Sequence, residues 1–327
     1  MLGREAARSA GPPMINEDSR LLTKAATLYY KADLTQAEIA QRLGISRQLV
    51  GRLLKRARAQ GIVEIRIRPS PSSSFTELEH ALETAWGLRE ARVVAPAAES
   101  DEANKEALGQ AAAAFLEQRI SAGDVVGLSW GSTLYQCARH LTPTPTPAVK
   151  AVQINGSLDR TTQPTHAEYI IHRVSEAFGA EPNLLPAPLI VDRPDIKASL
   201  VSDSLISAVL ELGRKATICV FGIGSLSSLS SLYKTGHVNE ELLQRLEASG
   251  SVGDICGRFY DHDGSPSAPD LDARTIAIEL SDLRSKGLSV GVAGGLHKVE
   301  AIRGALRGRY CTVLITDRET AEALLRD

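Results

Sequence analysis

Apolar positions recur at helical spacing in two short stretches near the N-terminus, residues 36–43 and 47–58. One apolar stripe runs along each stretch, formed by Ile39, Ala40 and Leu43 and by Val50, Leu53 and Leu54. Gly44 can adopt the positive φ that follows a helix end, and Ser46 is a good N-cap for the next helix. The pattern predicts a helix-turn-helix, against the alternative of a plain helical hairpin with a solvated charged face.

The polar face of the second predicted helix suits contact with duplex DNA. Arginine and glutamine can bond guanine and adenine edges in the major groove, and lysine suits phosphate. Residues 61–68, GIVEIRIR, alternate apolar and polar positions, which predicts a strand with a mostly basic face, a wing beside the helices. The predicted DNA-binding residues are Thr35, Gln36, Ser46, Arg47, Gln48, Gly51, Arg52, Lys55 and Arg66.

Charge is divided unevenly along the chain. The net charge is −2, yet residues 21–68 hold ten Lys/Arg against three acids, or +7, and the chain beyond residue 68 carries −9. A basic head on an acidic body indicates that only the head meets a polyanion. The four cysteines are far apart and form no CxxC pair, which indicates free thiols in a reducing cytoplasm. No apolar run approaches the roughly 18 residues of a membrane span, so no membrane partner is expected.

Beyond residue 75, short apolar stretches alternate with helical patterns. Strands that are apolar throughout belong to a sheet covered on both faces, so the pattern predicts a doubly wound α/β domain. One of the predicted strands is NLLPAPLI, residues 183–190. The expected divisions are a disordered lead-in (1–20), a winged helix-turn-helix DNA-binding domain (21–68), a linker (69–74) and an effector-binding and oligomerisation domain (75–327).

Glycine- and serine-rich loops follow four of the predicted strands, at residues 129–133, 155–157, 222–225 and 294–295. In such sheets ligands bind outside the carboxyl ends of the strands. Glycines let backbone N–H groups approach a ligand, helix N-termini favour anions, and hydroxyls and an amide suit a polyol. Tight turn chemistry explains any one loop equally well. Four such loops at equivalent strand ends predict a pocket for a small polar ligand.

The ordered motifs carry a family resemblance. After the helix-turn-helix come GLSWGST, LPAPL, FGIGSL, VGDICGRFYD and GVAGGLHKVEAIRGAL. This set resembles the SorC family of sugar-responsive bacterial transcription regulators over nearly the whole chain past residue 20. The resemblance implies an effector domain related in fold to sugar-phosphate isomerases and glucosamine-phosphate deaminases, without their catalysis. It also implies assembly as dimers or tetramers.

The resemblance extends to individual pocket residues. In the family the pocket is lined by the loop matching residues 131–133, by the acid matching Asp254 and by the lysine matching Lys298. Asn155 stands where some members have a lysine able to bond covalently to a sugar aldehyde, which argues against a Schiff base at this position. The predicted effector-binding residues are Ser129, Gly131, Ser132, Thr133, Asn155, Gly156, Ser157, Gly222, Gly224, Asp254 and Lys298.

The competing class is an enzyme like the sugar-phosphate isomerases or deaminases. Asp254, Asp261, His262 and Asp263 could supply acid–base groups. However, RFYDHDGSPS (258–267) is typical of a solvated hairpin turn, and no carboxylate pair or His–Asp spacing stands out. An enzyme also has no use for the basic head. The sequence therefore predicts no catalytic residue, no metal site and no cofactor.

The function predicted from the sequence is a cytoplasmic transcriptional regulator. Two or more heads bind spaced half-sites on a double-stranded DNA operator. The body forms a homo-oligomer, a dimer or tetramer, and binds a sugar, polyol or sugar phosphate that controls operator affinity. Repression and activation, the identity of the sugar and its phosphorylation are left open by the sequence.

Overall fold

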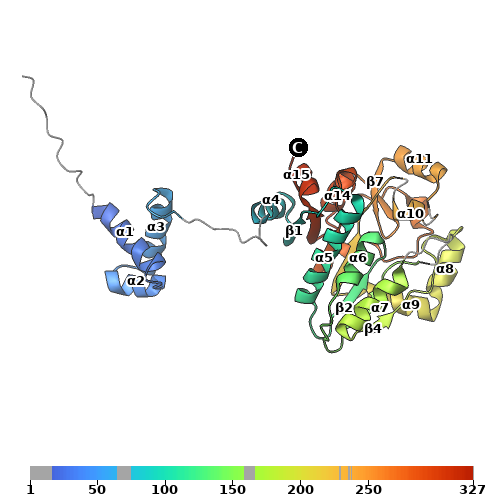
Figure 1. Cartoon of the computed structure of the whole chain (residues 1–327), viewed down its shortest axis with the longest axis horizontal. Coiled ribbons are helices and arrows are strands. Elements are labelled where there is room, and N and C mark those ends of the chain that lie inside the picture. Colours follow the sequence, from blue (N-terminus) through green and yellow to red (C-terminus); the bar gives the residue numbers. More distant parts are fainter. Residues whose placement is uncertain are drawn as a thin grey trace, which may run out of the picture. The chain divides into compact units, whose positions relative to one another are not determined.

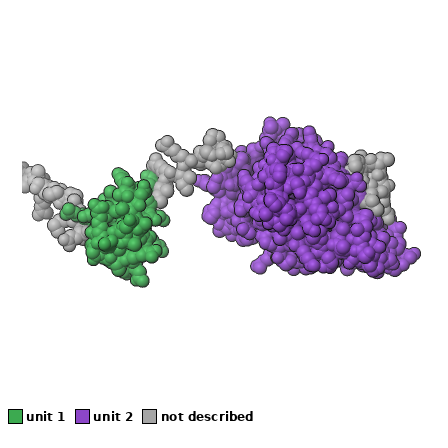
Figure 2. Space-filling view, turned by 90° about the horizontal axis from the view of Figure 1, so that it is seen from below, with its two compact units in different colours: residues 1–72 green, residues 73–327 purple. Residues whose placement is uncertain are grey.

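The computed structural model describes residues 17–64, 75–157, 166–227, 230–234, 236 and 238–326. The chain divides into two compact units, Met1–Ser72 and Ser73–Asp327, called here the head and the body (Figure 2). Over the described residues, no helix is both long enough and apolar enough to cross a membrane.

The head contains three helices (Figure 1): α1 (Glu17–Tyr30), α2 (Gln36–Leu43) and α3 (Arg47–Ala59). Helix α2 ends at Gly44 with φ 66°, and the Ser46 hydroxyl caps α3 by accepting from the Leu49 N–H at 3.2 Å. These two local signals fix the turn between the helices. The predicted helix-turn-helix is confirmed, with only the end of α3 differing by one residue.

The first helix corrects one predicted boundary. Helix α1 begins at Glu17, so residues 17–20 are helical and do not belong to a disordered lead-in. The reason is an apolar stripe at i, i+3 and i+4, because Leu22, Ala25 and Ala26 pack in one cluster with residues of α2 and α3. Residues 1–16 lie outside the described part of the chain.

The predicted wing is described only at its start. Residues 61–64 form a turn and a bend rather than a strand. Gly61, with φ 70°, turns the chain so that the N–H groups of Ile62 and Val63 both donate to the Ala57 carbonyl. Both side chains then pack against the core of the head. Residues 65–68, with Arg66, and the predicted linker 69–74 lie outside the described residues.

The body is built on a seven-stranded parallel sheet with the order β1-β10-β9-β5-β2-β3-β4. Its strands are β1 (Glu90–Val94), β2 (Val125–Leu128), β3 (Lys150–Gln153), β4 (Glu181–Asn183), β5 (Ile218–Gly222), β9 (Leu288–Val292) and β10 (Val313–Asp317). Alternate residues of a strand enter different apolar clusters, as Val220 and Phe221 do. The sheet is therefore covered on both faces, which confirms the predicted doubly wound α/β domain.

Helices cover the sheet in two groups. One apolar cluster contains residues of α5 (Asp101–Arg119), α6 (Ser132–His140) and α7 (Ala167–Phe178). The clusters against the other face take residues of α4 (Thr76–Trp86), α9 (Ser204–Arg214), α13 (Leu280–Arg284), α14 (Val299–Arg307) and α15 (Arg318–Leu324). The remaining short elements are α8 (Pro194–Ser202), α10 (Ser231–Lys234), α11 (Glu240–Ala248), α12 (Pro269–Asp272) and η2 (Leu296–Lys298).

The predicted strand over residues 183–190 is wrong. Strand β4 ends at Asn183, and from there to residue 189 the chain has no regular strand. Pro186 and Pro188 explain this, since proline has no N–H to donate to a sheet ladder.

A small antiparallel sheet lies beside the main one, formed by β6 (Gly224–Ser225), β7 (Ser251–Ile255) and β8 (Arg258–Asp261). The hairpin predicted for residues 258–267 is present, with the Asp261 N–H donating to the Ser265 carbonyl at 2.9 Å, but its first part is not solvated, because Arg258, Phe259 and Tyr260 are buried. Burial of Arg258 is possible because its guanidinium donates to the Ala277 and Ile278 carbonyls and to the Glu279 carboxylate.

Strand order places the carboxyl ends of β2 and β5 at a crevice. Strands β2, β3 and β4 follow one another toward one edge of the sheet, whereas β5, β9 and β10 lie on the other side of β2. The direction of the chain across the sheet therefore reverses between β2 and β5. Loops leave the sheet in opposite directions at such a point and open a space for a ligand.

Candidate functional site

A cavity of about 520 Å³ lies at the carboxyl ends of β2 and β5. Its walls come from the first turn of α5, the loops after β2, β3 and β5, the β7–β8 hairpin and η2. Nine of the eleven predicted effector-binding residues line it: Ser129, Gly131, Ser132, Thr133, Asn155, Gly222, Gly224, Asp254 and Lys298. Residues more than 160 positions apart in the sequence thus face one space, as the positions of Gly131 and Lys298 illustrate.

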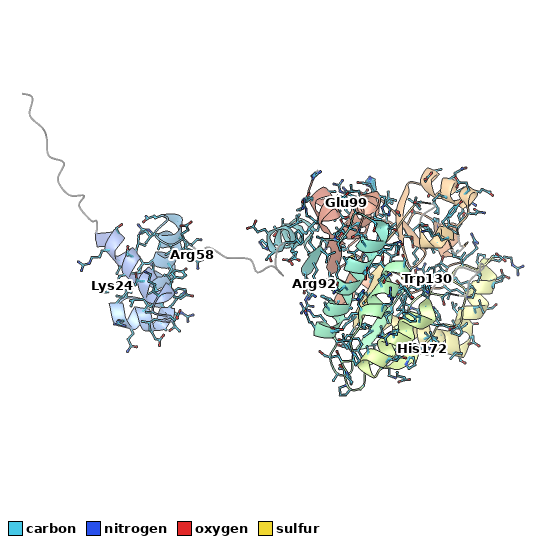
Figure 3. All side chains as sticks on the ribbon, in the orientation of Figure 1. Lys24, Arg58, Arg92, Glu99, Trp130 and His172 are labelled. Carbon is cyan, nitrogen blue, oxygen red and sulfur yellow. The ribbon has the colours of Figure 1, made fainter. Side chains whose placement is uncertain are left out.

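The other two predicted residues, Gly156 and Ser157, do not line the cavity and support its wall instead. A Cβ on Gly156 would lie 2.3 Å from the Pro188 carbonyl oxygen, so only glycine fits there. The Gly156 carbonyl accepts the indole N–H of Trp130 at 2.8 Å (Figure 3). The Ser157 hydroxyl accepts from the Gln153 amide at 2.9 Å. The Trp130–Gly156 bond holds the loop after β3 against the loop after β2, and the Gln153–Ser157 bond connects the loop after β3 to the end of its own strand.

One end of the cavity is suited to an anion. Helix α6 begins at Ser132 after Gly131, whose φ of 143° is accessible mainly to glycine, and no side chain caps its first turn. The N–H groups of that turn are therefore available to a ligand. Lys298 lines the same cavity, and burial lowers the pKa of its ammonium although Asp101 and Asp254 favour the charged form. Within the described residues Lys298 makes no ion pair.

The first turn of α5 brings charged residues that the sequence analysis missed. The Lys105 ammonium lies 2.5 Å from Asp101 and 3.0 Å from Glu102, so one cation pairs with two carboxylates and the group keeps a formal charge of −1. His297, the neighbour of Lys298, also lines the cavity, and burial lowers the pKa of its imidazole. The rule that ligands bind beyond strand ends applies to α5 as well, because α5 follows β1. The pocket loops were predicted from glycine-rich segments after strands, and no such segment follows β1.

A buried carboxylate lies among the polar groups of the cavity. Asp254 is 8% exposed, and burial raises its pKa to about 6 against the opposing effects of the Gly257 N–H and the Lys298 charge. The Gly257 N–H donates to Asp254 Oδ2 at 3.1 Å. A Cβ on Gly224 would lie 2.0 Å from Asp254 Oδ1. Gly224 is therefore needed to admit the carboxylate, whether or not it touches a ligand.

Asn155 lines the cavity and carries a buried acceptor without a partner among the described residues. Its side chain is 2% exposed, and Oδ1 has no hydrogen-bond partner among the described residues. A buried acceptor without a donor is destabilising, so such a group is rare in a folded protein. A ligand hydroxyl would supply the missing donor. Asn155 and Asp254 thus both suit a polyhydroxylated ligand.

Helix α3 of the head presents four of the predicted DNA-binding side chains on its surface. Arg47, Gln48, Arg52 and Lys55 are exposed on α3. Gly51 is half-buried, and a Cβ there would lie 3.5 Å from Gln36 Oε1 on α2. The hydroxyls of the two remaining described residues, Thr35 and Ser46, accept backbone N–H groups at the starts of α2 and α3.

Comparison with known proteins identifies both units. Residues 70–326 match the family described as "Putative sugar-binding domain", and residues 26–72 match the MarR family. The chain is 38% identical over 314 residues to the deoxyribonucleoside regulator of Bacillus subtilis, covering 96% of this chain and 100% of that protein. It is 33% identical to the sorbitol operon regulator of Klebsiella pneumoniae, covering 95% and 99%. The chain belongs to the SorC family of sugar-binding transcriptional regulators.

Solved structures of SorC-type regulators share this architecture. The full-length sorbitol operon regulator SorC of Klebsiella pneumoniae superposes with a TM-score of 0.73 at 33% identity, covering 95% of this chain and 100% of that chain. A DeoR family transcriptional regulator from Listeria monocytogenes gives a TM-score of 0.71 at 28% identity, covering 77% of this chain and 99% of that chain.

We expect Asp254→Asn to stabilise the ligand-free protein at neutral pH. The pKa of an aspartate in an unfolded chain is about 3.9, and that of Asp254 in the folded body is about 6. The folded state therefore favours the protonated form. Its contribution to stability is complete below pH 4 and is lost as the pH rises through 6. At pH 7.5 the buried charge costs up to about 3 kcal/mol, and asparagine removes this cost.

Urea unfolding of both proteins between pH 4 and 7.5 measures this effect. The advantage of Asp254→Asn should stay nearly constant from pH 7.5 to about 6.5 and then shrink as the pH falls from about 6 to 4. Asp263→Asn, at an exposed position of the β8 hairpin, is the matched control and should show no such pH dependence. An Asp254→Asn protein that is less stable than the wild type at pH 7.5 would contradict the assignment.

Proposed function

We propose that this SorC family protein binds an operator through α3 of its head and a small sugar phosphate, sugar or polyol in the cavity of its body. The observation that carries the proposal is the composition of that cavity. An uncapped helix N-terminus and a lysine without an ion pair among the described residues share one space with an unsatisfied amide oxygen and a buried carboxylate. The first pair suits a phosphate, and the second suits hydroxyl groups.

Named relatives support this choice of ligand class. They include regulators named for deoxyribonucleosides, for the sorbitol operon and for erythritol catabolism in Brucella abortus, the last at 29% identity over 314 residues. Sorbitol and erythritol are polyols, and their phosphate esters combine the two chemical features that the cavity suits. Asn155 offers no amine, so the proposed binding at this position is non-covalent.

Catalysis is not part of the proposal. Asp101 and Glu102 are paired with Lys105, which leaves Asp254 as the carboxylate suited to contact ligand hydroxyls. Burial raises the pKa of the Cys256 thiol in the same cavity, which disfavours the thiolate. The basic head of the chain is explained by a regulator in the cytoplasm and has no role in an isomerase or deaminase.

Control of the operator requires unequal binding. The ligand shifts the protein between DNA-competent and DNA-incompetent states only if it binds one of them more tightly. By linkage, the operator then changes the affinity for the ligand by the same factor.

Substitutions on α3 test the DNA-binding surface. Arg47→Ala and Arg52→Ala should each cost about 1–3 kcal/mol on the preferred operator and relax sequence choice, because each removes a contact to a base edge. Lys55→Ala should weaken all sequences alike and reduce the salt dependence. Selection from a random DNA pool measures both effects. Lys24→Ala, an exposed lysine of α1 (Figure 3), is the control that should leave sequence choice unchanged.

Lys298→Ala should remove the response to phosphorylated ligands and leave ligand-free operator binding intact. Loss of a charge-assisted bond to phosphate weakens binding roughly 10- to 100-fold. The probes are sorbitol, erythritol and deoxyribose, each free and as its terminal phosphate ester, tested by thermal shift and by operator release. Lys150→Ala, a lysine near the amino end of β3 that pairs with Glu181, is the matched control. Equal responses of Lys298→Ala and the wild type to a phosphate ester would refute this role.

A homo-oligomer is also proposed, because one head offers too small a footprint for tight specific binding. Light scattering should give a dimer or tetramer, both free and on DNA. The selected operator should contain two half-sites separated by whole helical turns. A monomer bound to a single site would contradict this assembly.

A further inference from the structure

A buried carboxylate at the end of β10 joins three parts of the body. Asp317 is 4% exposed and caps the N-terminus of α15. It does not line the cavity. No ion pair involves it among the described residues, and its two oxygens accept four hydrogen bonds. This arrangement is more elaborate than a helix cap requires.

Each oxygen of Asp317 has a distinct set of partners. Oδ1 accepts the Thr320 N–H at 2.8 Å, which is the helix cap itself. Oδ2 accepts from the Asn104 amide at 2.9 Å, the Thr320 hydroxyl at 2.9 Å and the Gly295 N–H at 2.6 Å. A Cβ on Gly294 would lie 2.1 Å from Oδ2, so this position must be glycine for the carboxylate to fit.

Two of these partners belong to elements that carry walls of the cavity. Gly295 immediately precedes η2, which carries His297 and Lys298. Asn104 lies on α5 next to Lys105. Asp317 therefore fixes the backbone that bears Lys298 to the start of α15, without touching the ligand space.

The other side of α15 contacts α4, as Figure 1 shows. Leu82 of α4 shares one apolar cluster with Ala321 and Leu324 of α15. Arg303 of α14, the helix that follows η2, donates to the Ala323 carbonyl near the end of α15 at 2.7 Å. Helix α15 is thus held at both ends by the segment that begins with η2.

Helix α4 is the first described element of the body along the chain from the head. It is tied to β1 by Glu79, which accepts the Val93 N–H at 2.9 Å, and by Glu83, which accepts the Ala91 N–H at 3.0 Å. A displacement of α15 therefore acts on α4, the described helix of the body that follows the head in the sequence.

We propose that Asp317 is the positioning residue through which ligand binding at Lys298 changes the positions of α15 and α4. The proposal rests on the function proposed above. A ligand that draws Lys298 toward it displaces η2, and the bonds from the Gly295 N–H to Asp317 and to the Thr320 hydroxyl, which itself donates to Asp317, make the start of α15 follow. Packed elements of this kind change between discrete arrangements rather than deforming smoothly, which is what a switch requires.

Asp317→Asn weakens this connection with little change in shape, because the Gly295 N–H loses the carboxylate acceptor and keeps only its bond to the Thr320 hydroxyl of α15 at 2.8 Å. The remaining oxygen can still cap α15, because asparagine is a good N-cap. The new amide group, however, places a donor where Oδ2 accepts the Gly295 N–H at 2.6 Å. Gly294→Ala weakens the same connection from the other side by displacing the carboxylate. Asp203→Asn makes the same substitution at the N-cap of α9, which does not contribute to the cavity, and is the matched control.

The experiment measures operator affinity of full-length proteins with and without the sorbitol, erythritol and deoxyribose compounds, on DNA selected by the wild type. For the wild type, the ratio of the operator affinities with and without an active compound should lie in the range of roughly 5- to 150-fold that is typical of allosteric coupling. Asp317→Asn and Gly294→Ala should each lower this ratio several-fold toward 1 while each still binds the compound by calorimetry. Asp203→Asn should keep the wild-type ratio.

The outcomes separate the two proposals. A merely structural role would lower the melting temperature and leave the ratio unchanged, which would overturn the coupling role of Asp317. Loss of compound binding in both variants would also overturn it, because the residue would then be needed to form the cavity. If Asp317→Asn does not fold, Gly294→Ala decides the matter. A wild-type protein that responds to none of the compounds would instead refute the proposed function, and with it the coupling.

Discussion

The parallel arrangement of all seven main strands is the constraint on which the site depends. Parallel strands end at the same edge of a sheet, so loops from distant parts of the sequence converge there. The reversal between β2 and β5 then opens the space into which Ser132, Asn155 and Lys298 project from separate loops. Coverage of both faces by helices makes this edge the place where polar groups can meet without disturbing the core.

Several polar groups of the cavity are energetically unfavourable without a ligand. Burial raises the pKa of Asp254 and lowers that of Lys298, so both groups are less stable in their charged forms than they would be in water. The Asn155 oxygen has no donor among the described residues. The fold tolerates these groups because the rest of the site is well bonded, as the Trp130–Gly156 and Gly257–Asp254 bonds show. Stability given up at a binding site in this way is common.

Local signals made part of the molecule predictable from its sequence. Gly44 and Ser46 determine the helix-turn-helix boundaries through the conformations of single residues. The strand-end rule and the family resemblance together placed nine of the eleven predicted effector residues at one cavity, with Asp254 coming from the resemblance alone. Prediction from the sequence failed where a role depends on contacts between residues distant in sequence. The burial of Arg258 depends on carbonyls near residue 277, and Asp317 acquires its partners from α5 and from the residue before η2. The strand predicted from the apolar content of residues 183–190 does not form, because Pro186 and Pro188 have no N–H to donate to a sheet ladder.

The opposite charges of the two units are consistent with DNA binding by the head and ligand binding by the body. In the function proposed above, phosphate contacts that carry no sequence information supply affinity to the basic head, and α3 supplies the base contacts. An acidic body is repelled by DNA and so leaves the head as the unit that binds it. A ligand in the body therefore has to act through the protein chain rather than through the electrostatic field, because one bound phosphate is a small change in a body that already carries an excess of acids. This requirement favours a short, fully bonded route between the cavity and α4, which is the kind of contact that a buried carboxylate with several donors provides.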